Sequence, residues 1–328
     1  MIGRPRIHPL AVLLLTLPLV SLEVRAQAWP SRPIKIVIPV AAAGAMDPLA
    51  RAVAARLSEM WKQSVLVENR VGANGIIGAD YVSKAEPDGY TLLMSEASPF
   101  VMSPHLYRTL PFDGLAGFTP ITQVSRVPWV IGISAAVPAN TLQEFVALAR
   151  AQPGKLAYGS FGLGSSVHVR VEQLKQALGI DLNHVPYKGA GPAMNDLLGG
   201  QIAMVMISPG LVEPHVRTGK LRMIAATTPE RLAALPALPT VAELAVPGFE
   251  AGTWFGMFGP PRLPQDIVIR VHAAMKVVLG SPSFQQQFIS GNWMVPSDLD
   301  TPEQFARFMR TDFERWGQAI RASGVSVD

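Results

Sequence analysis

Short β-branched apolar runs alternate along the chain with longer segments whose apolar residues recur at helical spacing. Ile34–Ile38 is a run of the first kind, and the segment from Asp47 to Lys62 is of the second. Further strands are predicted at 65–68, 90–94, 129–134, 156–159, 183–185, 202–207, 222–226 and 254–258. Further helices are predicted at 75–84, 99–108, 142–151, 165–178, 190–198 and 211–218, and two more close the chain. This order predicts an α/β fold of mostly parallel sheets flanked by helices.

The last helix carries an apolar stripe at helical spacing, with charged residues mostly on its other faces. The stripe consists of Phe305, Phe308, Met309, Trp316 and Ile320. We expect it to pack this helix onto the first half of the fold.

Composition narrows the range of functions. The chain has 328 residues, which is enough for about two domains. Because 49% of its residues are hydrophobic and only 16% are charged, we expect an ordered rather than a disordered protein. Its net charge of +4 is small and its basic residues are scattered, so a nucleic-acid partner is not expected. The absence of cysteine excludes disulfides, thiolate metal sites and cysteine nucleophiles. We expect no cofactor and no metal.

Residues 1–28 have the pattern of a secretory signal peptide, with Arg4 and Arg6 before an apolar run and an Ala26-Gln27-Ala28 cleavage sequence. A single N-terminal membrane anchor is the alternative. Cleavage after Ala28 would leave an exported mature chain beginning at Trp29.

Catalytic motifs are missing from the sequence. It contains no G-x-S-x-G elbow and no H-E-x-x-H. Gly159–Ser166 imitates a phosphate-binding loop, but Ser165 stands where that motif needs lysine. An exported hydrolase would need a nucleophile–base pair, which the sequence does not reveal.

Two predicted strand-to-helix loops share one construction. Pro39–Asp47 and Gly159–Ser166 are built of small residues and lead into helix N-termini, whose free N–H groups favour anions. Ligands of open α/β sheets bind at the carboxyl ends of strands, where both loops lie. The two loops are therefore predicted to close on a carboxylate from opposite sides. The alternative is that they are ordinary β–α connections.

Single residues in these regions allow two interpretations each. Asp47 is predicted as a helix N-cap, with Pro48 at the first helical position, or as a counter-charge for a ligand ammonium. Ser165, Ser166 and Ser208 are helix caps or ligand contacts. His168 packs locally or lines the ligand site. For Ser95, Ser98 and Trp254 there are likewise two interpretations: they pack within the protein, or they contact the ligand.

Six ordered segments of the mature chain resemble the Bug-type periplasmic solute-binding receptors of tripartite tricarboxylate transporters. They are Trp29–Ile34, Asp47–Arg51, Pro87–Leu93, His184–Gly189, Asp196–Gln201 and Leu238–Glu243. The resemblance implies a periplasmic, two-lobed clamshell with crossing hinge strands, lobe 1 being 29–129 plus 254–328 and lobe 2 being 130–253. It implies no enzymatic activity, a small carboxylate ligand, a monomer, and membrane permease subunits as partners. A sensor protein is the alternative partner.

The same resemblance implies which residues contact the ligand. They are Val40, Ala41, Ala43, Gly44, Ala45, Met46, Asp47, Ser95, Ala97, Ser98, Ser160, Gly164, Ser165, Ser166, His168 and Ser208. Two features depart from the family pattern. Ala43 replaces the first glycine of a common Gly-Gly pair, and Glu96 lies beside an expected anion site. Glu96 either points away from that site or recognises a cationic group of the ligand, such as the ammonium of an amino acid.

Gly44→Val tests the first loop. A branched side chain there should obstruct the approach of a carboxylate to the backbone and abolish ligand binding. Isothermal titration calorimetry measures the effect, and an unchanged affinity would contradict the placement of the ligand.

Overall fold

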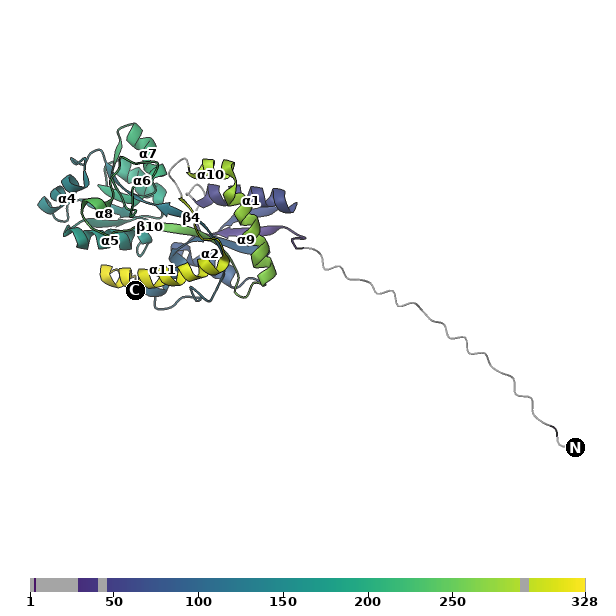
Figure 1. The fold of residues 1–328 in the computed structure, drawn as a ribbon. Coiled ribbons are helices and arrows are strands. Elements are labelled where there is room, and N and C mark those ends of the chain that lie inside the picture. Colours follow the sequence, from purple (N-terminus) through teal and green to yellow (C-terminus); the bar gives the residue numbers. More distant parts are fainter. Residues whose placement is uncertain (1–2, 4–28, 41–45, 290–294, 328) are drawn as a thin grey trace.

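The computed structural model describes residues 3, 29–40, 46–289 and 295–327, and it has two lobes, each built on one sheet (Figure 1). Apart from Gly3, the predicted signal peptide lies outside the described residues. In the described part of the chain, no helix is long and apolar enough to cross a membrane.

Lobe 1 contains a mixed sheet of six strands. Its strands are β1 (Ile34–Ile38), β2 (Val65–Asn69), β3 (Thr91–Glu96), β4 (Thr119–Pro128), β10 (Gly252–Gly259) and β11 (Val295–Pro296), in the order β11-β4-β10-β3-β1-β2. β1 runs parallel to β2 and β3, whereas β10 is antiparallel to β3 and β4. Its helices are α1 (Met46–Trp61), α2 (Ile76–Ser83), α3 (Ser103–Leu106), α9 (Gln265–Gly280), α10 (Pro282–Ile289) and α11 (Pro302–Ser323), with short turns η1 (Ala73–Gly75) and η2 (Ser98–Met102).

Lobe 2 contains a five-stranded sheet of the same kind. Its strands are β5 (Val130–Ser134), β6 (Ala157–Ser160), β7 (Asn183–Pro186), β8 (Met204–Ile207) and β9 (Leu221–Ala226), in the order β7-β6-β8-β5-β9. Its helices are α4 (Leu142–Ala151), α5 (Ser166–Leu178), α6 (Ala190–Leu198), α7 (Pro209–Arg217) and α8 (Val241–Leu244). β6 is parallel to β7 and β8, so these strands end at one edge of the sheet.

Along the central strands of lobe 1, successive side chains point to opposite faces of the sheet, so apolar residues form a hydrophobic core on each face. Leu92 and Met94 of β3 pack in a cluster with Leu49 of α1, while Leu93 joins a second cluster with Phe305 of α11. Both faces are thus covered by helices, as a parallel arrangement requires.

Two connections join the lobes, and one buried threonine holds them together. The chain passes from β4 to β5 at Trp129 and returns to β10 after Ala251. The Thr227 hydroxyl lies 2.8 Å from the carbonyl oxygens of both residues. The Thr227 N–H donates to Trp129 (3.0 Å), and the Ala251 N–H donates to the Thr227 carbonyl (2.8 Å). Thr227 therefore fixes the spacing of the two connections next to the paired ends of β4 and β10.

α11 forms a third link between the lobes and lies along α5 (Figure 1). Its predicted apolar stripe is confirmed, since Phe305, Met309, Trp316 and Ile320 are buried and Phe308 packs beside them. The Arg170 guanidinium of α5 lies 4.1 Å from the Trp316 ring, and a side chain of this kind can stack on an aromatic face. α11 therefore packs onto lobe 1, as expected, and also onto α5 of lobe 2.

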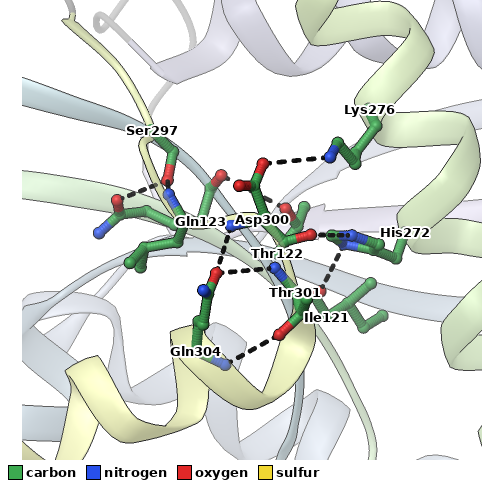
Figure 2. Close-up of polar contacts among 10 residues, drawn as sticks. Ile121, Thr122, Gln123, His272, Lys276, Ser297, Asp300, Thr301 and Gln304 are labelled. Carbon is green, nitrogen blue, oxygen red and sulfur yellow. Dashed lines mark hydrogen bonds and ion pairs between the residues drawn. The ribbon is translucent and has the colours of Figure 1, made fainter.

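The segment leading into α11 is fastened to β4 and α9 (Figure 2). The His272 ring spans the carbonyl oxygens of Ile121 and Asp300 at 3.1 and 2.9 Å. Ser297 donates to Gln123 at 2.8 Å, and a reciprocal capping box between Thr301 and Gln304 begins the helix. These contacts set the point from which α11 extends toward lobe 2.

The sequence-based prediction of the elements was incomplete. Strand β4 was missed, because prolines and polar residues interrupt it. Three helices rather than two follow β10, and the predicted helix 99–108 is a π-helical turn followed by the short α3. The sheets are mixed rather than mostly parallel, because β4, β5, β9, β10 and β11 form antiparallel pairs.

Thr227→Val tests whether the threonine hydroxyl holds the two connections together. Valine matches threonine in shape but cannot donate, so we expect a loss of about 1–2 kcal/mol in the free energy of unfolding. Urea unfolding measures this loss, with Thr227→Ser, which keeps the hydroxyl, as the control. A valine variant as stable as the wild type would show that the hydroxyl does not hold the connections.

Candidate functional site

The first predicted loop is only partly within the described residues. Ala41, Ala43, Gly44 and Ala45 lie outside them, so the expectations for these residues and for Gly44→Val remain predictions. Val40 follows β1, and its carbonyl accepts a hydrogen bond from the Asn69 side chain at 2.9 Å. Met46, at the start of α1, is buried.

Asp47 is bound to neighbouring side chains. α1 begins at Met46, so Asp47 lies within the first turn, and the prediction that it is the N-cap with Pro48 at the first helical position was wrong. Arg51 donates to both carboxylate oxygens of Asp47, at 2.9 and 3.0 Å, and Asn69 donates to one of them at 3.0 Å. Because Arg51 already supplies a counter-charge, Asp47 is poorly suited to bind a ligand ammonium.

The second predicted loop is a compact turn between β6 and α5. Ser165 is the N-cap of α5 and accepts a hydrogen bond from the His168 N–H at 3.4 Å. The Gly164 N–H donates to Nδ1 of His168 at 3.1 Å. Ser166 and Ser160 are buried at either end of the turn. Ser165 is thus a cap, and His168 packs inside the turn.

His168 stacks on His184, which sequence reasoning did not single out as a site residue. The ring centroids are 3.9 Å apart and the planes are inclined by 11°. Burial lowers the pKa of His168, and burial together with the neighbouring His168 ring lowers the pKa of His184 to about 4. Both rings are therefore neutral near pH 7. Because β6 and β7 are paired, residues far apart in sequence meet here.

Ser160 and His184 form a close pair that the sequence had not revealed. The Ser160 Oγ lies 2.6 Å from His184 Nε2 and also donates to the Gly162 carbonyl at 3.0 Å. Catalysis of the serine–histidine type also needs a group that orients the histidine and a nucleophile that substrate can reach. Within the described chain no carboxylate hydrogen-bonds to His184, and the Ser160 side chain is fully buried. The pair therefore stabilises the turn.

The turn after β6 lies against lobe 1. Asn74 of η1 donates to the Leu163 carbonyl at 3.1 Å, directly joining the lobes. Gly164 has a φ of +70°, and a Cβ there would lie 2.5 Å from Val327 and 3.3 Å from Leu106. Asn74 precedes Gly75, a turn signal, but its partner in the other lobe could not be read from the sequence.

The remaining predicted residues lie at two other strand ends. Ser95, at the end of β3, donates to the Glu96 carbonyl at 3.3 Å, and Ala97 is fully buried. Ser98 begins η2, and its hydroxyl oxygen lies 3.6 Å from the Met102 sulfur and also forms a hydrogen bond with the Glu96 side chain. Ser208, after β8, lies at the N-cap position of α7, but its side chain makes no capping bond.

The Ser208 hydroxyl is one of six buried side-chain groups that have no hydrogen-bond partner among the described residues, together with atoms of Trp29, Asp80, Gln123, Arg170 and Thr253. Buried polar groups usually have a partner, and Ser208 is the member of this set that follows a strand of lobe 2 at its carboxyl end. Its hydroxyl is therefore free to bind a group from outside the chain. In the part of the chain that is described, no three His, Asp or Glu side chains gather as a metal site would require.

Comparison with known proteins supplies the wider context. Residues 49–325 match the model of the tripartite tricarboxylate transporter family receptor, TctC. Protein BugT of Bordetella pertussis is 33% identical over 309 residues, covering 94% of each chain.

Solved structures agree in fold and sequence. R. palustris Rpa4515 with adipate has a TM-score of 0.85 and 32% identity, covering 91% of this chain and 99% of its own. Periplasmic binding protein BugD has a TM-score of 0.83 and 32% identity, with the same coverage. MatC of Rhodopseudomonas palustris with bound malate has a TM-score of 0.81 and 27% identity, covering 89% and 100%. The predicted two-lobed fold and family are confirmed, and the chain belongs to the TctC family of tripartite tricarboxylate transporter receptors, which are solute-binding proteins.

Proposed function

We propose that the chain is a periplasmic receptor that captures a small carboxylate between its lobes and delivers it to membrane permease subunits. The observation that carries this proposal is the contact from Asn74 to Leu163. It brings the start of α5 in lobe 2 against the carboxyl-end side of lobe 1. A solute bound there would touch both lobes and stabilise their contact.

The start of α5 offers donors of the right kind for a carboxylate. The first N–H groups of a helix have no intrahelical partner, and the helix dipole places about half a positive charge there. Ser208 follows β8, the parallel neighbour of β6, so its hydroxyl, which has no partner among the described residues, lies at the same edge of the sheet as this helix start. A carboxylate needs several such hydrogen bonds to offset the loss of its hydration.

The relatives support the same class of ligand. The similar structures of Rpa4515 and MatC contain adipate and malate, which are both dicarboxylates. The neutral state of His168 and His184 leaves backbone and hydroxyl donors, rather than imidazolium charge, to bind the anion from lobe 2.

The proposal includes the finer expectations from the sequence. Lobe 1 comprises residues 29–129 and 254–328, and lobe 2 comprises 130–253, the boundaries lying close to Trp129 and Ala251, which Thr227 binds. The ligand contacts come from the loop ends around Val40, Ser98, Ser166 and Ser208. The chain is exported by cleavage after Ala28, works as a monomer and releases its ligand chemically unchanged.

Ser208→Ala tests this site. We expect wild-type protein to bind adipate or malate in calorimetry and the variant to bind about threefold to tenfold more weakly, because one donor to the anion is lost. Stability should hardly change, since the hydroxyl has no partner within the protein.

Ser83→Ala is the matched control, because Ser83 ends α2 at the opposite end of the lobe 1 sheet and donates to the Asp80 carbonyl. Equal affinities for Ser208→Ala and Ser83→Ala would exclude Ser208 from the site. The absence of binding by a wider panel of carboxylates would contradict the proposed function.

A further inference from the structure

Glu96 is the last residue of β3 and lies at the edge of the sheet where the ligand is proposed to bind. β3 pairs with β1 in parallel, Val37 being opposite Leu93. Continuing this register by three residues places Glu96 level with Val40, beyond the end of β1. On its other side Glu96 is paired with Phe255 of β10.

The side chain of Glu96 belongs to the face of the sheet that carries α1. Side chains along a strand alternate between the two faces, so Glu96 follows Leu92 and Met94. Those two residues pack in one cluster with Met46, the first residue of α1. The Glu96 side chain therefore follows Leu92 and Met94 on the same face of β3, on the side of the sheet where α1 begins.

A carboxyl group in this position lacks a charged partner. Among the described residues, no lysine, arginine or histidine forms an ion pair with Glu96, and its stabilising contact is a hydrogen bond with the Ser98 side chain. Asp47, the other acidic residue nearby in α1, is paired with Arg51. Glu96 thus differs from Asp47, whose negative charge is balanced by Arg51.

Burial raises the pKa of Glu96, and the Ser98 hydrogen bond opposes that effect only in part. The residue nevertheless keeps some of its surface open to solvent. A carboxyl group that is enclosed by protein, belongs to a residue that is not fully buried and has no counter-charge is suited to a cation that arrives with the ligand.

We propose that Glu96 is a specificity-determining residue that pairs with a cationic nitrogen of the ligand. This inference rests on the proposed function. The preferred solutes are then aminocarboxylates, whose carboxylate is bound by the helix start of α5 and the Ser208 hydroxyl. Their ammonium group lies against Glu96. A simple dicarboxylate would instead place a second negative charge beside this carboxylate, which is unfavourable in a site of low dielectric.

Calorimetry with matched pairs of solutes tests the proposal: aspartate with succinate, glutamate with glutarate, and 2-aminoadipate with adipate. The members of a pair differ only in the amino group. We expect wild-type protein to bind at least one aminocarboxylate tenfold or more tightly than its partner.

Glu96→Gln should remove most of that preference, weakening the aminocarboxylate tenfold or more while the partner binds equally or more tightly. Glu86→Gln is the matched control, because exposed Glu86 precedes the opposite end of β3 and the charge change is identical. Circular dichroism and thermal melting check that both variants are folded.

The pH dependence of binding to the wild-type protein supplies a readout that needs no variant. Because burial raises the pKa of Glu96, its carboxyl ionises at a higher pH than a free glutamate, and the affinity for an aminocarboxylate should increase as the pH is raised. A protonated Glu96 that donated to a ligand carboxylate would give the opposite trend.

Two outcomes overturn the proposal in different ways. Equal or tighter binding of the partners that lack the amino group, with Glu96→Gln behaving like Glu86→Gln, would refute the role of Glu96 and leave the receptor function standing. Failure of all six carboxylates to bind would refute the receptor function for these solutes and the role of Glu96 with it.

Discussion

The relative position of the two lobes depends on the hydrogen bonds that Thr227 makes to both connections between them. One buried hydroxyl lies between the carbonyl oxygens of Trp129 and Ala251, each in a separate connection. Two backbone hydrogen bonds of Thr227 join the same segments. The lobes are also linked through α11, which lies along α5, and through the hydrogen bond from Asn74 to Leu163.

The polar side chains near the contact between the lobes fall into two groups: some have hydrogen-bond or charged partners within the protein, and others do not. Asp47 has Arg51 and Asn69, and Ser160 has His184 and Gly162. These residues hold loops in place. Ser208 has no partner, and Glu96 has no counter-charge among the described residues. A receptor that binds a solute reversibly needs groups of the second kind, because a donor already satisfied within the protein gains little from a ligand.

The stacked histidines show how lobe 2 keeps its turn rigid without adding charge. His168 accepts a hydrogen bond from the Gly164 N–H through Nδ1, which requires that nitrogen to be unprotonated. Burial favours the neutral form of both rings. The turn places the start of α5 next to lobe 1, where Asn74 binds the Leu163 carbonyl, and the two neutral rings add no positive charge there.

Local pattern alone determined most regular elements, because strands such as β1 and helices such as α4 bury faces whose periodicity is written in the sequence. It also indicated which strand ends carry small and hydroxyl residues, and the ordered motifs identified the family. Strand β4 could not be found in this way, since Thr122, Gln123 and Ser125 are polar and become buried only through pairing with β10. The partner of Asn74, the stacking of His184 and the open state of Ser208 likewise depend on residues far apart in sequence. Sequence thus determined the elements and the kind of site, while the tertiary structure decided which polar groups are satisfied, because satisfaction depends on distances between segments that local periodicity does not encode.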